Sequence, residues 1–358
     1  MDNKEFFMKN LKILSAILAT VLILTLTLVS CGGGGGGGSG NYGKDDGKDS
    51  GTTGGGGGTM TWTAVPNSPF DKTDWIKGIA YGAGKFVAVG DIIAYSSDGI
   101  TWTKVTGFKF GDYGESIQAI VWGKDKFVAV GGHGNRAYSA DGVNWTRVND
   151  SIVKSNYGFE ALAYGNNMFI TGGSLAGPGT GIMAYSPDGV NWTEVDSEEV
   201  ILEAICYGKD KFVAGLYIPD YGSASAYTFD GLDWELITNI NAFDEYYDIN
   251  DIVYGGGKFV AVGAVSRAAY SSDGINWTDV KDTKFTEKGS PHTILAVAYG
   301  NNRFVAGGHG GKMAYSSDGV TWTAVGNTTF NTTEYVYSIA FGNGTFVAAS
   351  KYTMAYSK

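Results

Sequence analysis

Arginine, histidine, cysteine and proline are all scarce in this chain of 358 residues. The sequence has only four arginines, three histidines, two cysteines and six prolines, and charged residues make up 17% of it. The formal net charge is −10, so most of the surface would repel a phosphate backbone. We therefore expect no nucleic acid among the partners.

The few histidines and cysteines also argue against metal or nucleophilic chemistry. His133 and His309 occupy equivalent Gly-Gly-His-Gly segments, His292 stands alone, and none has the spacing of a metal ligand. Cys206 falls within an apolar strand pattern, where a free thiol acts as a small buried side chain. We expect no metal, no cofactor and no disulfide bond between Cys206 and Cys31.

The first 31 residues have the features of an export signal. Three lysines, at positions 4, 9 and 12, precede an apolar run from residue 13 to residue 29. The run ends at Leu28-Val29-Ser30-Cys31, which resembles the bacterial lipobox. This resemblance implies cleavage before Cys31 and acylation of its thiol. Two or three acyl chains would hold the protein firmly on a membrane, because each buried methylene group contributes about 0.8 kcal/mol.

An uncleaved transmembrane anchor is the alternative, since a run of about 17 apolar residues can just span a bilayer. Gly32 stands where an Asp would resemble the signal for inner-membrane retention, so we expect an outer-membrane or cell-surface location. Residues 32–58 are glycine with scattered polar residues, and they predict a flexible tether. Its mean reach would be about 30 Å.

A repeated unit occupies the rest of the chain. In residues 78–103 it reads GIAYG, KFVAVG, AYSSDG and TWT, which are four short β-rich runs separated by glycine-containing turns. The tryptophan of the last run recurs every 40–47 residues, at Trp62, Trp102, Trp145, Trp192, Trp234, Trp277 and Trp322. We expect these side chains to pack between neighbouring units, each burying about 200 Å².

Asp-Gly pairs separate the third and fourth runs in six copies of the unit. Such pairs supply the positive φ angles of tight hairpins, so we interpret the aspartates as structural. They lie at Asp98, Asp141, Asp188, Asp230, Asp273 and Asp318, each followed by glycine.

The two ends of the repeat region complement each other. The seventh copy stops at Lys358 without its fourth run, and the region begins with the isolated pentapeptide 61–65, which is identical to 321–325. The N-terminal strand is therefore expected to complete the last blade and to remove its free edge. The sequence predicts an all-β fold: a seven-bladed β-propeller over residues 59–358, with four-stranded antiparallel blades.

The segment Ser96-Ser-Asp98-Gly99-Ile-Thr101-Trp102 resembles the Asp-box, or BNR, turn of sialidase-type propellers, except that Asp and Gly are adjacent here. The FVAVG run with the following Asp-Gly turn is also similar to photosystem II assembly-factor-like propellers and to exported bacterial propellers. The resemblance covers residues 60–358 and implies the fold, but it leaves the function open. Sialidase activity is not expected, because the arginines do not occupy the inner-strand positions that this family requires.

Two sets of residues are candidates for binding on the face that carries the long loops. Residues at the start of each inner strand should surround the channel mouth: Lys77, Gln118, Glu160, Glu203, Asn250, Leu295 and Tyr337. Variable loops carry aromatic side chains, among them Tyr217, Tyr246 and Tyr247, and exposed aromatic residues on a rigid scaffold suit recognition.

Three hypotheses follow. The first is a monomeric, membrane-anchored lipoprotein that binds a protein or a glycan through its loop-rich face without catalysis. The second is a glycoside hydrolase that uses Glu160 and Glu203, because paired carboxylates flanking a cleft perform that reaction. The third is a scaffold that assists the assembly of other envelope complexes, as the assembly-factor resemblance implies.

Overall fold

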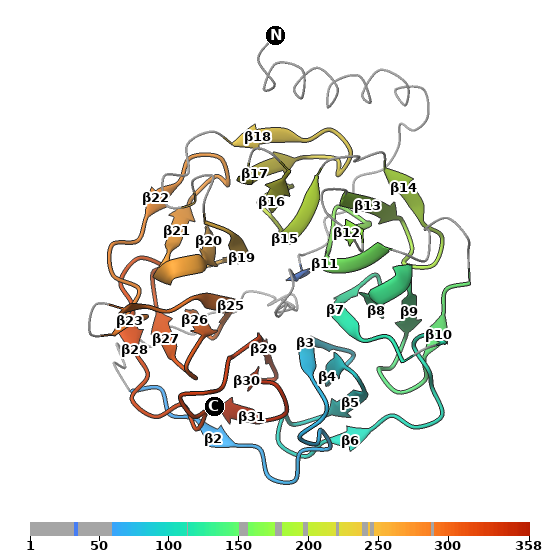
Figure 1. Ribbon diagram of the computed structural model, residues 1–358, viewed down its shortest axis with the longest axis horizontal. Helices are drawn as coiled ribbons and strands as arrows, with labels where there is room; N and C mark the ends of the chain where they lie inside the picture. Colours follow the sequence, from blue (N-terminus) through green and yellow to red (C-terminus); the bar gives the residue numbers. More distant parts are fainter. Residues whose placement is uncertain are drawn as a thin grey trace, which may run out of the picture.

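The computed structural model is a ring of seven β-sheets around a central axis (Figure 1). It describes residues 59–112, 114–149, 157–175, 181–195, 200–219, 222–237, 243, 247–287 and 290–358, together with the backbone of residues 32–34. Each blade has four antiparallel strands, ordered from the axis outward, and in the third blade the additional strand β1 (Gly32–Gly34) pairs with the inner strand. The predicted seven-bladed β-propeller is confirmed.

The strands are short, and their lengths repeat from blade to blade. The inner strands are β3 (Ile76–Gly82), β7 (Ile117–Gly123), β11 (Tyr157–Gly165), β15 (Ile201–Gly208), β19 (Ile249–Gly255), β25 (Ile294–Gly300) and β29 (Ser338–Gly342). The second strands are β4 (Lys85–Gly90), β8 (Lys126–Gly131), β12 (Met168–Leu175), β16 (Lys211–Ile218), β20 (Lys258–Gly263), β26 (Arg303–Gly308) and β30 (Thr345–Ala349).

The outer half of each blade is shorter. The third strands are β5 (Ile93–Ser96), β9 (Arg136–Ser139), β13 (Gly181–Ser186), β17 (Gly222–Thr228), β21 (Ala268–Ser271), β27 (Met313–Ser316) and β31 (Met354–Ser357). The outermost strands are β6 (Thr103–Lys104), β10 (Thr146–Arg147), β14 (Thr193–Val195), β18 (Glu235–Ile237), β22 (Thr278–Asp279), β28 (Thr323–Ala324) and β2 (Thr63–Ala64). A small hairpin, β23 (Thr286–Glu287) and β24 (Ser290–Pro291), and two 3₁₀ turns, η2 (Gly132–Gly134) and η3 (Ala264–Ser266), lie in loops.

The N-terminal strand closes the ring. β2 pairs antiparallel with β31, with Thr63 opposite Tyr356, and the Val65 N–H donates to the Met354 carbonyl at 2.8 Å. In Figure 1, β2 completes the blade that contains the C-terminus. The closure predicted from the identical pentapeptides is therefore confirmed.

The N-terminal segments lie largely outside the described residues. The export signal, Cys31 and most of the tether are not described, so their interpretation stays a prediction. Gly32–Gly34 form β1, which pairs antiparallel with the inner strand β11, with Gly33 opposite Ala163.

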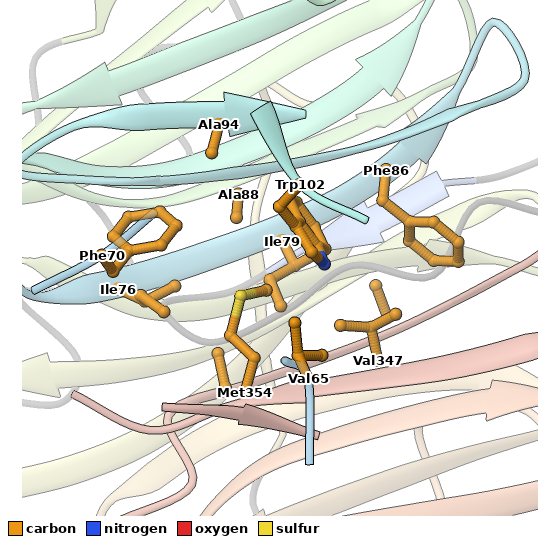
Figure 2. Packing of buried hydrophobic residues seen from close by; sticks show 12 residues of the cluster. Val65, Phe70, Ile76, Ile79, Phe86, Ala88, Ala94, Trp102, Val347 and Met354 are labelled. Carbon is orange, nitrogen blue, oxygen red and sulfur yellow. The ribbon is translucent and has the colours of Figure 1, made fainter. Parts of the chain in front are cut away.

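Apolar side chains fill the seams between blades. At the closing seam, Phe86 and Trp102 of the first blade pack with Val347 and Met354 of the last (Figure 2). Val65, from the N-terminal strand, joins the same cluster. Six further clusters of this kind occur, and Trp62, Trp192, Trp277 and Trp322 are buried in them as well. Trp145 and Trp234 are partly buried against the same clusters, so the tryptophans of the repeat pack between blades, as expected.

Each seam also has a close contact between a glycine and an aromatic ring. The last residue of every inner strand is glycine. The residue before that glycine is aromatic in every inner strand, and its ring lies against the last glycine of the preceding inner strand. A Cβ on Gly208 would stand 2.2 Å from Cγ of Tyr254, and one on Gly342 would stand 2.1 Å from Cγ of Tyr81. The other pairs are Gly82–Trp122, Gly123–Tyr164, Gly165–Tyr207, Gly255–Tyr299 and Gly300–Phe341. The contact therefore recurs at all seven seams and closes on itself.

Two types of turn connect the strands of a blade. The hairpins between first and second strands have two successive residues with positive φ, as at Asn301 (46°) and Asn302 (54°), which matches the strand twist. In the Asp-Gly turns only the glycine has positive φ, 74° at Gly99, while Asp98 Oδ1 accepts the N–H groups of Ile100 and Thr101 at 2.8 and 2.7 Å. The expected positive φ is therefore confirmed for the glycines and wrong for the aspartates, which instead act as hydrogen-bond acceptors for the backbone.

Three further observations concern Cys206, membrane-spanning helices and metal sites. Cys206 is buried, as its apolar context predicted. Over the described part of the chain, no helix is long and apolar enough to cross a membrane. Within the same ranges, no three His, Cys, Asp or Glu side chains are grouped so that they could hold a metal ion.

The glycine–aromatic contact gives a test of the ring. Gly208→Ala should lower the free energy of unfolding by about 2–3 kcal/mol, because the added methyl group overlaps Tyr254 and forces two inner strands apart. Gly326→Ala is the control, since no heavy atom lies within 4 Å of the position of its added Cβ. Urea denaturation of both variants measures the effect, and equal stabilities would contradict this account of the seams.

Candidate binding face

The two faces of the ring differ in their loops. Tight turns, between first and second strands and between third and fourth strands, lie on one face, which we name the turn face. Because successive strands are antiparallel, the longer connections, between second and third strands and between successive blades, lie on the opposite face, which we name the loop face. Every inner strand begins at the loop face.

A β-bulge occurs at the loop-face end of six inner strands. The pairing with the second strand skips one residue in each blade, for example Lys77 between Ile76 and Gly78. The skipped residues are Lys77, Gln118, Glu160, Glu203, Asn250 and Leu295. A bulged residue leaves the regular alternation of side chains, so a bulge can redirect its side chain. These six residues, with Tyr337 directly before β29, form a set that we name the mouth ring.

Acidic side chains gather on the mouth ring at the third and fourth blades. Burial, followed by the charges of Asp248 and Glu160, raises the pKa of Glu203 to about 8. Glu203 Oε2 is buried and has no hydrogen-bond partner among the described residues. Partial desolvation also raises the pKa of Glu160, whose Oε1 accepts a hydrogen bond from Ser174 Oγ at 3.2 Å. In this part of the ring, the ionised forms of Glu160 and Glu203 are therefore destabilised.

Lysines and aromatic rings gather on the opposite side, across the closing seam. The Lys77 Nζ lies 4.3 Å from the ring centroid of Trp75 and 5.5 Å from that of Tyr337. The Lys351 Nζ, from the last blade, lies 4.6 Å from the same Trp75 ring. Trp75 and Tyr337 are themselves 5.9 Å apart, centroid to centroid. We name Trp75, Lys77, Tyr337 and Lys351 the cationic clamp.

Two more aromatic side chains continue the clamp toward the sixth blade. Tyr335 lies 6.0 Å from Tyr337, and His309 packs edge-on against Tyr335 at 4.4 Å, centroid to centroid. Tyr335 is 40% exposed, and its backbone pairs with that of His309. Cationic and aromatic groups therefore extend over parts of three blades on the loop face.

The backbone around the clamp is held by reciprocal hydrogen bonds. The Trp75 N–H donates to Asp91 Oδ2 at 2.9 Å, and the Asp91 N–H donates to the Trp75 carbonyl at 3.1 Å. The Ile76 N–H donates to the Lys351 carbonyl at 2.7 Å, which joins the first and last blades. The backbone that carries Trp75 and Lys351 is therefore held by contacts within the fold.

The structure brings several predicted residues together and separates others. Lys77 and Tyr337 meet in the clamp, and Glu160 and Glu203 interact electrostatically. The Asn250 amide instead donates to the Ile294 carbonyl at 2.9 Å and links two blades. Of the remaining predicted residues, Gln118 and Leu295 are half-buried and Tyr217 is exposed. The guanidinium group of Arg267 lies over the ring of Tyr247. Tyr246 is outside the described residues.

The sequence analysis missed Trp75, Lys351, Tyr335 and His309 as binding candidates. A signal existed for Trp75. Seven of the nine tryptophans occupy the repeat position and Trp122 lies on an inner strand, whereas Trp75 precedes an inner strand and has no repeat role. A bulky aromatic residue outside the repeat pattern marks a position that the fold itself does not require.

The two carboxylates differ in their surroundings. Burial raises the pKa of Glu203 to about 8, with the charges of Asp248 and Glu160 adding to the effect. Burial also raises the pKa of Glu160, whereas the hydrogen bond from Ser174 and the charge of Lys77 act in the opposite direction.

Comparison with known proteins shows the fold and no family. No protein-family model matches the chain, and no curated protein matches it. Among solved structures, YCF48 from Cyanidioschyzon merolae is 17% identical, with a TM-score of 0.60, over 83% of this chain and 98% of that one. A structure described as YCF48 bound to D1 peptide is 16% identical, with a TM-score of 0.62, over 83% of this chain and 96% of that one.

A third similar structure is the computationally designed Ika8 protein, which is 13% identical, with a TM-score of 0.53, over 84% of this chain and all of that one. At these identities the likeness concerns the propeller fold. None of the three comparisons gives support to the glycoside-hydrolase alternative.

The raised pKa of Glu203 predicts how stability depends on pH. The folded protein holds a proton that the unfolded chain releases between about pH 4.5 and pH 8, so this residue opposes folding increasingly as the pH rises through that window. Glu203→Gln should therefore raise the free energy of unfolding at pH 9 by about 1–3 kcal/mol and change it little at pH 5.

Urea denaturation at both pH values measures this effect. Glu194→Gln is the matched control, because Glu194 is exposed on an outer strand. An equal effect of Glu203→Gln at the two pH values would contradict the assignment of a raised pKa.

Proposed function

We propose that this chain is a lipid-anchored envelope protein that binds a protein partner through the loop face, with no catalysis of its own. The observation that carries the proposal is the cationic clamp. It is a group of aromatic and cationic side chains at the mouth of the ring, and its tryptophan lies outside the repeat pattern. Aromatic residues on a rigid scaffold are typical of recognition surfaces.

A protein partner is favoured over a glycan for two reasons. One of the structural neighbours, YCF48, has been solved with a peptide, so a propeller of this shape can accept a polypeptide segment. In addition, both lysine ammonium groups lie over the Trp75 ring, where a sugar would otherwise stack. The assembly role considered from the sequence is one form of the same proposal, since an assembly scaffold also binds protein.

The location follows from the N-terminal segment. Acylation of Cys31 would place the protein on a membrane, and residues 32–58 would let the propeller reach partners at a distance of about 30 Å. An outer-membrane or cell-surface position agrees with the absence of Asp after Cys31.

Site-specific photo-crosslinking tests the binding face. A photoreactive phenylalanine analogue is placed at Tyr217, which is 38% exposed on the loop face, or at Phe229, which is 54% exposed on the turn face of the same blade. We expect a discrete protein adduct from Tyr217 in intact cells and none from Phe229. Adducts from both positions alike, or from neither, would argue against loop-face binding.

The lipid anchor has its own test. Cys31→Ala should abolish incorporation of radiolabelled palmitate, while Cys206→Ala should leave it unchanged, because Cys206 is buried within the propeller. Mass spectrometry of the membrane-bound chain should find an acylated N-terminus at Cys31. Recovery of a membrane-bound chain that still begins at Met1 would establish the uncleaved anchor instead.

A further inference from the structure

We propose that the cationic clamp is a receptor for carboxylate side chains, and that the partner presents an extended acidic peptide segment to it. This inference rests on the proposed function and specifies the chemistry of the partner. It concerns Lys77 and Lys351, whose ammonium groups lie on either side of the closing seam and share one aromatic ring.

The first step is the state of the two ammonium groups. Among the residues that the structure describes, neither Nζ atom makes a hydrogen bond or an ion pair, and both lie against aromatic rings. The carboxylates of Asp91 and Glu160 act on Lys77 only through their charge. A lysine ammonium carries three N–H donors, and an aromatic ring does not satisfy them. Burial lowers the pKa of Lys77, because the charged ammonium group is destabilised when it loses water. An anionic ligand beside the ammonium group would stabilise its charge.

The second step is that nearby carboxylates are already engaged. Asp91, whose charge acts on Lys77, accepts hydrogen bonds from the Trp75 N–H at 2.9 Å and from Ser116 Oγ at 2.6 Å. Glu334 accepts from the Asn331 N–H at 2.8 Å and from Thr353 Oγ1. These carboxylates fix the loops around the clamp, and neither forms an ion pair with Lys77 or Lys351 within the described ranges.

The third step concerns the shape of the ligand. The cations cover the Trp75 ring, so the clamp offers charge at that point, while Tyr335 is 40% exposed beside it and offers apolar surface. A peptide that alternates acidic and apolar side chains would place carboxylates at the lysines and a hydrophobic residue against Tyr335. The net charge of −10 would repel a uniformly anionic chain, so the attraction is local and a short segment suits it.

Fluorescence anisotropy with the full-length protein in detergent tests the inference. The probe is a fluorescein-labelled decapeptide in which Glu alternates with Val and Phe, and the matched probe has Gln in place of every Glu. We expect the acidic peptide to bind at least about tenfold more tightly than its Gln counterpart, as a charge-assisted hydrogen bond contributes about that factor. Equal binding of the two peptides would overturn the proposal.

Variants then locate the site. Lys77→Gln and Lys351→Gln should each weaken binding of the acidic peptide by about tenfold, and Lys77→Arg should retain most of it. Lys85→Gln is the control. It removes the same charge, but Lys85 begins the second strand β4 at the turn face. Acidic-peptide binding that survives the double variant Lys77→Gln/Lys351→Gln would place the site elsewhere and overturn the inference.

A second probe and the crosslinking readout separate the remaining outcomes. Oligogalacturonate that binds more tightly than the acidic peptide, with the same dependence on Lys77, would identify a glycan and overturn the peptide assignment. If the Tyr217 adduct forms equally in the double variant, loop-face binding stands and the clamp inference fails. If no loop-face adduct forms in the unsubstituted protein, the proposed function itself fails.

Discussion

The contact between a glycine at the end of one inner strand and an aromatic ring on the next sets the spacing of the whole ring. A Cβ on any of these seven glycines would come within about 2 Å of an aromatic carbon, so no larger residue fits without separating two blades. Each ring also packs against a phenylalanine of its own blade, as Tyr207 does with Phe212 at 4.8 Å. Because the contact repeats seven times and ends on the first blade, it gives every pair of neighbouring blades the same close approach.

This constraint lies near the turn face and leaves the loop face free to vary. Lysines at the turn face reinforce the same seams: the Lys211 Nζ donates to the Asp273 carbonyl of the next blade at 2.7 Å, and the Lys258 Nζ donates to the Asp318 carbonyl at 2.9 Å. At the other end of the inner strands, bulges interrupt the regular pairing. The glycine–aromatic contacts and the proposed binding site therefore lie at opposite ends of the same strands.

Much of this architecture could be predicted because it repeats. The tryptophan spacing, the Asp-Gly turns and the identical pentapeptides are local patterns, and the fold and the closing strand follow from them. The role of the aspartates was only partly predictable, because the capping of Ile100 and Thr101 by Asp98 depends on the path of the backbone. The bulges explain why Lys77 or Glu203 leaves the regular strand alternation, and a single sequence has no signal for a bulge.

The candidate site was harder to predict because its parts are distant in sequence. Trp75 and Lys351 are separated by most of the chain, and only closure of the ring brings them together. Glu160 and Glu203 were recognised as neighbours because they come from consecutive blades, but their shared rise in pKa depends on burial that no sequence pattern reports. Contacts within one blade or between consecutive blades follow from the repeat, whereas contacts across the closing seam do not.

The position of the clamp on the closing seam has a thermodynamic consequence. Trp75 and Lys77 belong to the first blade, and Tyr337 and Lys351 belong to the last, so the complete clamp exists only when the N-terminal strand has closed the ring. A ligand that contacts both blades binds the closed ring and not an opened one, and by linkage it must stabilise the closure. The hydrogen bond from the Ile76 N–H to the Lys351 carbonyl crosses the same seam. The proposed binding site and the ring closure therefore share the same few residues, and a partner bound across the clamp would also hold the propeller shut.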